Sequence, residues 1–227
     1  MARQLNFDLP VTPDFTRNGF VVSDSNALAV ALIDNWQSWP QGKIILSGPS
    51  GAGKTHLTRI WAEDTGAQMI EAIDLSVDSV ERLSNAAVTV ENVPAIAEDA
   101  AAQTALFHLH NLLIAHGQPL LMTGVGTPNH WRMTLPDLQS RIDAAGHAAL
   151  SAPDDGLLQA VLEKHFADRQ LAPRPDVIPY LLPRIERSYL AALQIVAALD
   201  EESLRDRKPI TRPMAAALLD KDTSDTR

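Results

Sequence analysis

The sequence predicts an α/β domain with a mostly parallel sheet, followed by a small all-helical domain. Short apolar runs alternate with helical periods over the first two thirds of the 227 residues, whereas only helical periods follow Pro153. Alternation of this kind is typical of strands that pair in parallel through crossover helices. The chain is 45% hydrophobic and 21% charged, which indicates a globular protein long enough to bury a sizeable core.

Five apolar runs are the expected strands, at residues 44–46, 68–72, 87–90, 120–123 and 148–150. The helices expected between them lie at 27–33, 55–64, 77–83 and 102–113, the last with apolar residues at i, i+3 and i+4. Helical periods then recur at about 154–168, 174–186, 188–203 and 211–219. We therefore expect an extended tail (1–17), the α/β domain (18–152), the helical domain (153–220) and a polar tail (221–227).

Composition excludes several classes of protein. The absence of cysteine excludes disulfides, zinc fingers, iron–sulfur ligation and thiol catalysis. A net charge of −9 argues against direct binding of duplex DNA, which needs clustered Lys and Arg. The N-terminus lacks the apolar run of a secretory signal, and residues 100–131, although uncharged, are too polar for a membrane span. We expect a cytoplasmic protein.

The strongest motif is a phosphate-binding loop between the run 44–46 and the next helix. It reads Gly48, Pro49, Ser50, Gly51, Ala52, Gly53, Lys54 and Thr55, matching G-x-x-x-x-G-K-[ST]. Glycines let backbone N–H groups converge on a phosphate, and the helix N-terminus adds positive potential. Lys54 is expected to reach the terminal phosphates and the Thr55 hydroxyl to bind Mg²⁺. His56, the next residue, is also expected to contact the nucleotide.

A second candidate motif follows the expected strand at residues 87–90, where the next two residues are Glu91 and Asn92. A P-loop ATPase places an Asp at this strand end for magnesium, often followed by a Glu that orients the attacking water. Glu91 is therefore a candidate catalytic residue and magnesium ligand, and the alternative is a solvated strand end. Because Asn92 cannot accept a proton as a carboxylate would, we expect intrinsic ATP hydrolysis to be slow or absent.

These motifs and the helical C-terminal part resemble the AAA+ ATPases and, within them, the DnaA branch, over about residues 18–219. Segment 18–27 resembles the opening of the DnaA-type ATPase domain, which lies beside the nucleotide base. The resemblance thus makes Val21, Val22 and Asn26 candidate contacts. Segment 121–124 resembles the sensor-1 strand end.

Two arginines take roles from the same resemblance. Segment 137–142 is similar to the box that carries the arginine finger, which places this role, in trans, on Arg141. Segment 184–188 resembles the start of the sensor-2 helix, so Arg187 is the candidate to touch the phosphates from the lid. The family implies bound ADP or ATP with Mg²⁺, and its members commonly form oligomers.

The N-terminal tail carries a short motif, Gln4-Leu5-Asn6-Phe7-Asp8-Leu9, similar to the bacterial sliding-clamp-binding motif. Leu5, Phe7 and Leu9 can fill an apolar groove while Gln4 supplies an orienting amide. The alternative is an arm that packs on its own domain.

A DnaA-like ATPase core joined to such a tail resembles the Hda-type regulators. The resemblance implies binding to the DNA polymerase III sliding clamp through the tail and docking on ATP-loaded DnaA through the AAA+ face. Arg141 would then stimulate ATP hydrolysis by DnaA, a negative regulation of replication initiation. The alternative is an active ATPase of the helicase-loader or transposition-helper type, which would turn over ATP and bind single-stranded DNA.

Overall fold

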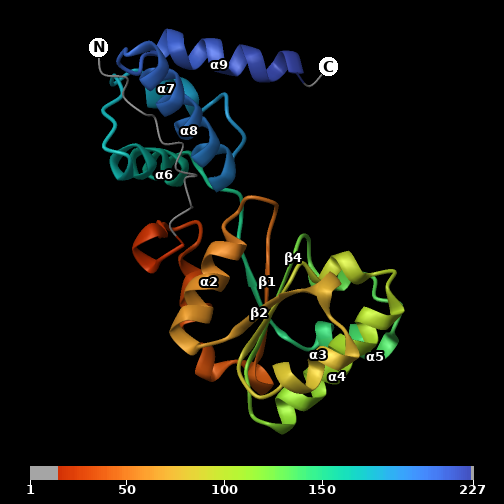
Figure 1. Ribbon diagram of the computed structural model, residues 1–227. Coiled ribbons are helices and arrows are strands. Elements are labelled where there is room, and N and C mark those ends of the chain that lie inside the picture. Colours follow the sequence, from red (N-terminus) through yellow and green to blue (C-terminus); the bar gives the residue numbers. More distant parts are fainter. Residues whose placement is uncertain (1–14, 226–227) are drawn as a thin grey trace, which may run out of the picture.

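The computed structural model describes residues 15–225, with side chains as far as residue 220, and it places a helical lid above an α/β domain (Figure 1). Within these residues the sheet has five parallel strands in the order β2-β3-β4-β1-β5. Their bounds are β1 Lys43–Ser47, β2 Gln68–Glu71, β3 Val88–Glu91, β4 Leu120–Gly124 and β5 Gly146–Ala149. The predicted parallel α/β fold is therefore confirmed.

Helices cover both faces of the sheet, because strand side chains alternate between two apolar clusters. Ile44 and Leu46 of β1 pack with α1 and α2, whereas Ile45 between them packs with α3, α4 and α5. All five residues of β1 are buried, as expected for a central parallel strand. The helices are α1 Ala27–Asp34, α2 Lys54–Thr65, α3 Val77–Leu83, α4 Ala100–Ala115 and α5 Pro136–Asp143.

The uncharged stretch of residues 100–131 forms α4 and β4. Leu106, Leu109 and Leu113 of α4 are buried against the sheet. No helix within residues 15–225 combines the length and the apolar character needed to cross a membrane.

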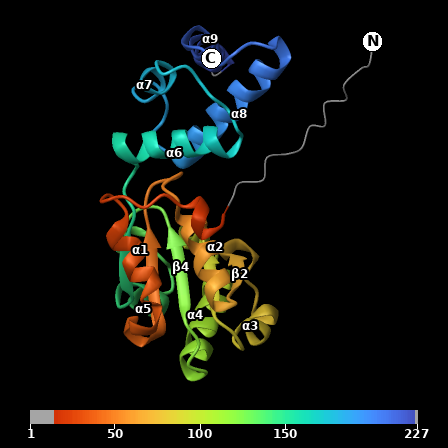
Figure 2. The same cartoon turned by 90° about the vertical axis from the view of Figure 1, so that its left-hand side faces the viewer.

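The four lid helices described are α6 Asp155–Asp168, α7 Val177–Leu181, α8 Tyr189–Asp206 and α9 Arg212–Asp225. They enclose a core of their own, and they stand above the carboxyl ends of the strands, toward which the β4 arrow points (Figure 2). Side chains cap two of them: Asp154 accepts from Leu157 N–H at α6, and Ser188 accepts from Ala191 N–H at α8.

Two lid helices differ from the expected bounds. The helix expected at 174–186 spans only Val177–Leu181, and Pro183, which has no N–H to donate to the preceding turn, follows its end. The helix expected to end at residue 219 continues to Asp225.

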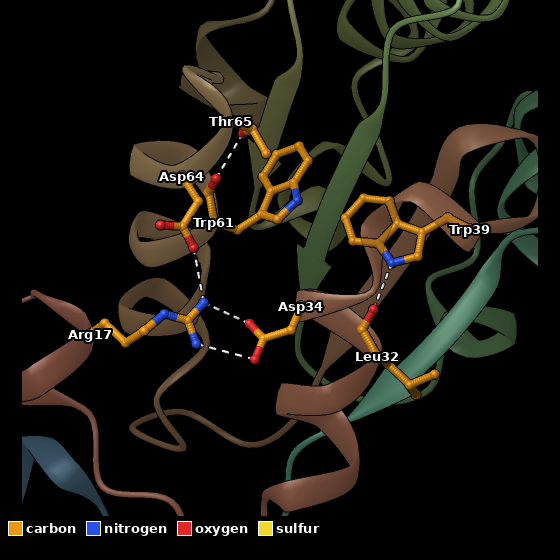
Figure 3. A network of polar contacts seen from close by, with 7 residues as sticks. All are labelled: Arg17, Leu32, Asp34, Trp39, Trp61, Asp64 and Thr65. Atoms are coloured by element: carbon orange, nitrogen blue, oxygen red, sulfur yellow. Dashed lines mark hydrogen bonds and ion pairs between the residues drawn. The ribbon is translucent and has the colours of Figure 1, made fainter.

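The first described residues are held across α1 and α2 by an ion-pair network (Figure 3). Arg17 Nη2 donates to Asp34 Oδ1 at 2.6 Å and to Asp64 Oδ2 at 2.9 Å, and Nη1 donates to Asp34 Oδ2 at 3.1 Å. Hydrogen bonds that Arg17 donates to these two carboxylates raise the pKa of Arg17. Since Asp34 ends α1 and Asp64 lies on α2, the network fixes the chain that leads into residues 18–26.

Candidate nucleotide-binding site

A cavity of about 490 Å³ lies between the carboxyl ends of the strands and the lid. The volume falls in the range of small-molecule sites, roughly 300–1,000 Å³. The phosphate-binding loop forms its floor, the segment around Val21 one side, and α6 and α8 the roof. The fold thus brings the predicted loop, the strand end at Glu91 and the lid to one place.

The loop turns sharply from β1 into α2. Gly51 and Gly53 adopt positive φ angles of 70° and 94°, in a region that glycine enters without steric cost. Lys54 Nζ donates to the carbonyls of Gly48 at 2.8 Å and Pro49 at 2.7 Å, so the ammonium lies over the loop. Burial lowers the pKa of Lys54, and the charge of Glu91 opposes the change.

Glu91 ends β3 and lines the cavity beside Thr55. Burial raises the pKa of Glu91; the hydroxyls of Thr55 and Thr58 act against this change. Among the described side chains, Glu91 Oε1 is buried without a hydrogen-bond partner. A carboxylate oxygen without a partner, next to a hydroxyl, fits Mg²⁺, which prefers oxygen ligands.

No group of three or more His, Asp or Glu that could hold a metal occurs in residues 15–225. In many nucleotide sites Mg²⁺ is bound through one or two protein oxygens, with phosphates and water completing the shell. Thr55 and Glu91 are the residues that would hold it.

Asn92 has a left-handed backbone, with φ of 55°. Its N–H donates to Thr123 Oγ1 of β4 at 3.0 Å, and both residues line the cavity. Asparagine tolerates this conformation better than most residues. At this end of β3 the cavity is therefore lined by the amide residue Asn92 as well as by Glu91.

The lid touches the loop directly at the start of α8. Tyr189 N–H donates to Gly51 O at 2.9 Å, and the Tyr189 hydroxyl lies 3.2 Å from Asn26 Nδ2. The Tyr189 ring stacks on Phe20 at 5.8 Å between centroids. A Cβ added to Gly51 would lie 2.4 Å from Ser188 Cβ, so this close approach requires glycine.

The segment predicted to lie beside the base forms one side of the cavity. Val21 lines the cavity, and its carbonyl accepts a hydrogen bond from Asn26 Nδ2 at 2.9 Å. Asn26 is thus a buried support behind this side, whereas Val22 is 56% exposed and does not line the cavity. Phe15, which sequence reasoning missed, also lines it and makes an edge contact with His56 at 5.4 Å.

Neither predicted arginine lines the cavity. Arg187 Nη2 pairs with Asp155 Oδ1 at 2.7 Å, and its side chain is 53% exposed. Arg141, in the last turn of α5, is exposed and does not line the cavity. The tail residues Gln4, Leu5, Phe7 and Leu9 lie outside the described residues. The assigned roles of all these side chains stay predictions.

A buried basic pair lies at the amino end of the sheet, close enough to Arg141 to feel its charge. Lys43 Nζ and His110 Nε2 are 2.7 Å apart, and each residue is 1% exposed. Burial and the charges of Lys43 and Arg141 lower the pKa of His110 to about 4. His110 therefore stays neutral at physiological pH.

The roof residues are the main part of the site that sequence reasoning missed. Val161, Lys164, His165 and Asp168 of α6 line the cavity together with Tyr189. Their spacing along α6 places them on one face, but three of the four are polar, so the sequence alone does not distinguish this face from a solvent-exposed one.

Comparison with known proteins agrees with this geometry. Residues 154–219 match the family model described as the lid domain of Hda. Domain III of the replication initiation protein DnaA from Thermotoga maritima superimposes with a TM-score of 0.79, 19% identity, and coverage of 94% of this chain and 98% of that chain.

Two further structures share the fold. AMPPCP-bound DnaA from Aquifex aeolicus gives a TM-score of 0.68 at 18% identity, covering 86% of this chain and 70% of that chain. The RuvB Holliday junction branch migration motor from Thermotoga maritima gives 0.72 at 12% identity, covering 92% and 72%. These likenesses show the AAA+ P-loop fold.

Proposed function

We propose that this chain, which shares its fold with DnaA domain III and whose residues 154–219 match the Hda lid model, is a nucleotide-binding regulator of replication initiation that stimulates ATP hydrolysis by DnaA. The observation that carries the proposal is the cavity itself, in which a complete phosphate-binding loop meets an Hda-type lid. The AMPPCP bound to the Aquifex aeolicus DnaA supports an adenine nucleotide here, ADP or ATP with Mg²⁺.

Within this site each group has a distinct task. The loop N–H groups and Lys54 hold the phosphates, while Thr55 and Glu91 hold Mg²⁺. The lid covers the nucleotide through the contact of α8 with Gly51. Because Asn92 supplies no carboxylate, bound nucleotide is hydrolysed slowly and keeps the domain in a shape that can dock.

Arg141 acts on a partner in this proposal. The residue is exposed on α5 and does not line its own cavity, so its guanidinium is available to the γ-phosphate of a neighbouring DnaA. A guanidinium there stabilises charge that develops during phosphoryl transfer, an effect of roughly 10³–10⁵ in rate for arginine fingers.

The test is ATP hydrolysis by DnaA with DNA-loaded sliding clamp and this protein. Arg141→Ala should abolish the stimulation, whereas Arg174→Ala, which removes an exposed lid arginine, should keep it. Unchanged stimulation by Arg141→Ala would refute the finger role. ATP turnover by the isolated protein at an ordinary ATPase rate would instead favour a helicase-loader or transposition-helper ATPase.

The tail is proposed to recruit the protein to the clamp through Gln4, Leu5, Phe7 and Leu9. In a pull-down with the clamp, Gln4→Ala should weaken capture, while Asn6→Ala, an intervening position, should not. Equal capture of the unmodified protein and Gln4→Ala would contradict this role.

A further inference from the structure

Helix α6 brings a charged pair into the cavity. Lys164 Nζ donates to Asp168 Oδ1 at 3.0 Å and to Oδ2 at 2.9 Å, and both residues line the cavity. Their side chains are 25% and 44% exposed. Val161, one turn before Lys164, is buried and lines the same cavity.

The pair is not arranged to stabilise its own helix. Asp168 is the last residue of α6, where the helix dipole disfavours a negative charge. The order Lys164 then Asp168 is also the weaker orientation for an i,i+4 ion pair. A second i,i+4 pair on α6, Gln159 Nε2 to Glu163 Oε1 at 2.8 Å, is exposed and does not line the cavity.

The phosphate-binding loop indicates which part of a bound nucleotide lies beside Lys164 and Asp168. A P-loop holds the phosphates above Gly51–Thr55, with Glu91 and Thr123 on the side of the terminal phosphate. His56 lies on the other side, where its ring meets Phe15 and Phe20 edge-on. His165, next to Lys164, lies near His56: burial lowers the pKa of His165, and the charge of His56 acts in the same direction.

This orientation leaves the space under α6 for the base of a bound nucleotide. Val21 and Val161 offer apolar surfaces for its faces, and Lys164 and Asp168 are the charged groups beside them. Asn26 is already engaged with Val21 O, Ser23 N–H and the Tyr189 hydroxyl.

We propose that Lys164 and Asp168 bind the polar edge of the adenine base and determine base preference. The Asp168 carboxylate accepts from the 6-amino group, and Lys164 donates to the adjacent ring nitrogen. Adenine offers this donor beside an acceptor, and an ammonium and a carboxylate keep bonding capacity after pairing with each other. The inference rests on the proposed binding of an adenine nucleotide.

The experiment is a chemical double-mutant cycle by calorimetry. The proteins are wild type, Lys164→Met, Asp168→Ala and the control Glu163→Gln. The ligands are ADP, the purine-riboside diphosphate that lacks the 6-amino group, and 2′-deoxy-ADP. Thermal unfolding checks that each variant folds.

We expect wild type and Glu163→Gln to lose about tenfold in affinity when the 6-amino group is absent. Asp168→Ala, which removes the acceptor, should bind ADP about tenfold more weakly than wild type and should be nearly indifferent to the 6-amino group. Lys164→Met should weaken ADP binding by a similar factor.

Two outcomes would overturn the inference. One is an equal loss on both bases in Asp168→Ala, which would mean that the pair does not contact the amino group. The other is coupling to the 2′-hydroxyl alone, which would place the pair on the ribose. If wild type binds no ADP, and Lys54→Ala is indistinguishable from it, the proposed nucleotide binding itself fails.

Discussion

Gly51→Ala perturbs the contact between the lid and the phosphate-binding loop. Gly51 has a φ of 70°, where an L-residue with a Cβ costs about 1 kcal/mol or more. The added Cβ would lie 2.4 Å from Ser188 Cβ and 2.9 Å from Ser188 Oγ. Carbon atoms in contact are separated by about 3.5 Å or more, so the start of α8 must move by roughly 1 Å.

That movement breaks the hydrogen bond from Tyr189 N–H to Gly51 O, which is 2.9 Å long. The loss is about 1 kcal/mol, and with the backbone cost the docked lid is destabilised by about 2 kcal/mol. If nucleotide binding requires the docked lid, ADP affinity falls by up to about thirtyfold.

The assay compares ADP binding and thermal unfolding in Gly51→Ala and Gly66→Ala. Gly66 is the matched control, because it also has a φ of 70° but a Cβ added there would have nothing within 4 Å. Ser188→Gly removes the clashing atoms, and glycine is itself an acceptable N-cap, so this second change should restore affinity. Equal affinities of Gly51→Ala and Gly66→Ala, or no rescue by Ser188→Gly, would refute the reasoning.

Three other residues give further expectations. Burial raises the pKa of Glu91 above its usual 4.5, so ionisation of Glu91 destabilises the folded state as pH rises. Glu91→Gln should therefore raise the unfolding temperature at pH 7 but not at pH 4. The same variant should weaken Mg²⁺-dependent ADP binding. Lower stability of Glu91→Gln at pH 7 would count against this. Folding lowers the pKa of His110 from 6.5 to about 4, so the unfolded state binds a proton more readily than the folded state. The free energy of unfolding should therefore be fully retained above pH 6.5 and should fall by up to about 3 kcal/mol toward pH 4, as measured by denaturant unfolding. Lys43→Met should raise that pKa in an NMR titration, and an unchanged value would show that the pair is not coupled. Asn92 has a φ of 55°, which alanine tolerates less well than asparagine or glycine. Asn92→Ala should therefore lower the free energy of unfolding by about 1 kcal/mol in calorimetry, and Asn92→Gly should lower it by less. Equal losses would exclude backbone strain as the cause.

Much of the fold was predictable because its signals are local. The run Ile44-Ile45-Leu46 is apolar on both faces of the sheet, as a central strand must be, and the loop motif follows it directly. The charge-free helix of residues 100–115 covers one face of the sheet with a clear period. Such patterns need no knowledge of what packs against them.

The roof of the cavity was not predictable in this way. Whether Arg187 or Tyr189, two residues later, faces the phosphate-binding loop depends on how the lid packs on the α/β domain. No local sequence pattern predicts that packing. Similarly, Lys164 and Gln159 both have partners four residues on, but only packing decides which pair lines the cavity. The helix expected at 174–186 exists as α7, but it is shorter than the helical period indicates, spanning Val177–Leu181.

The central claim is that the cavity between the loop and the lid binds an adenine nucleotide through Lys54. Calorimetric titration of ADP with Mg²⁺ into wild type and Lys54→Ala tests it most directly. We expect one ADP per wild-type chain and about a hundredfold weaker binding to Lys54→Ala, since charge-assisted bonds to phosphate are lost. Equal binding by the two proteins, with both folded, would contradict the claim.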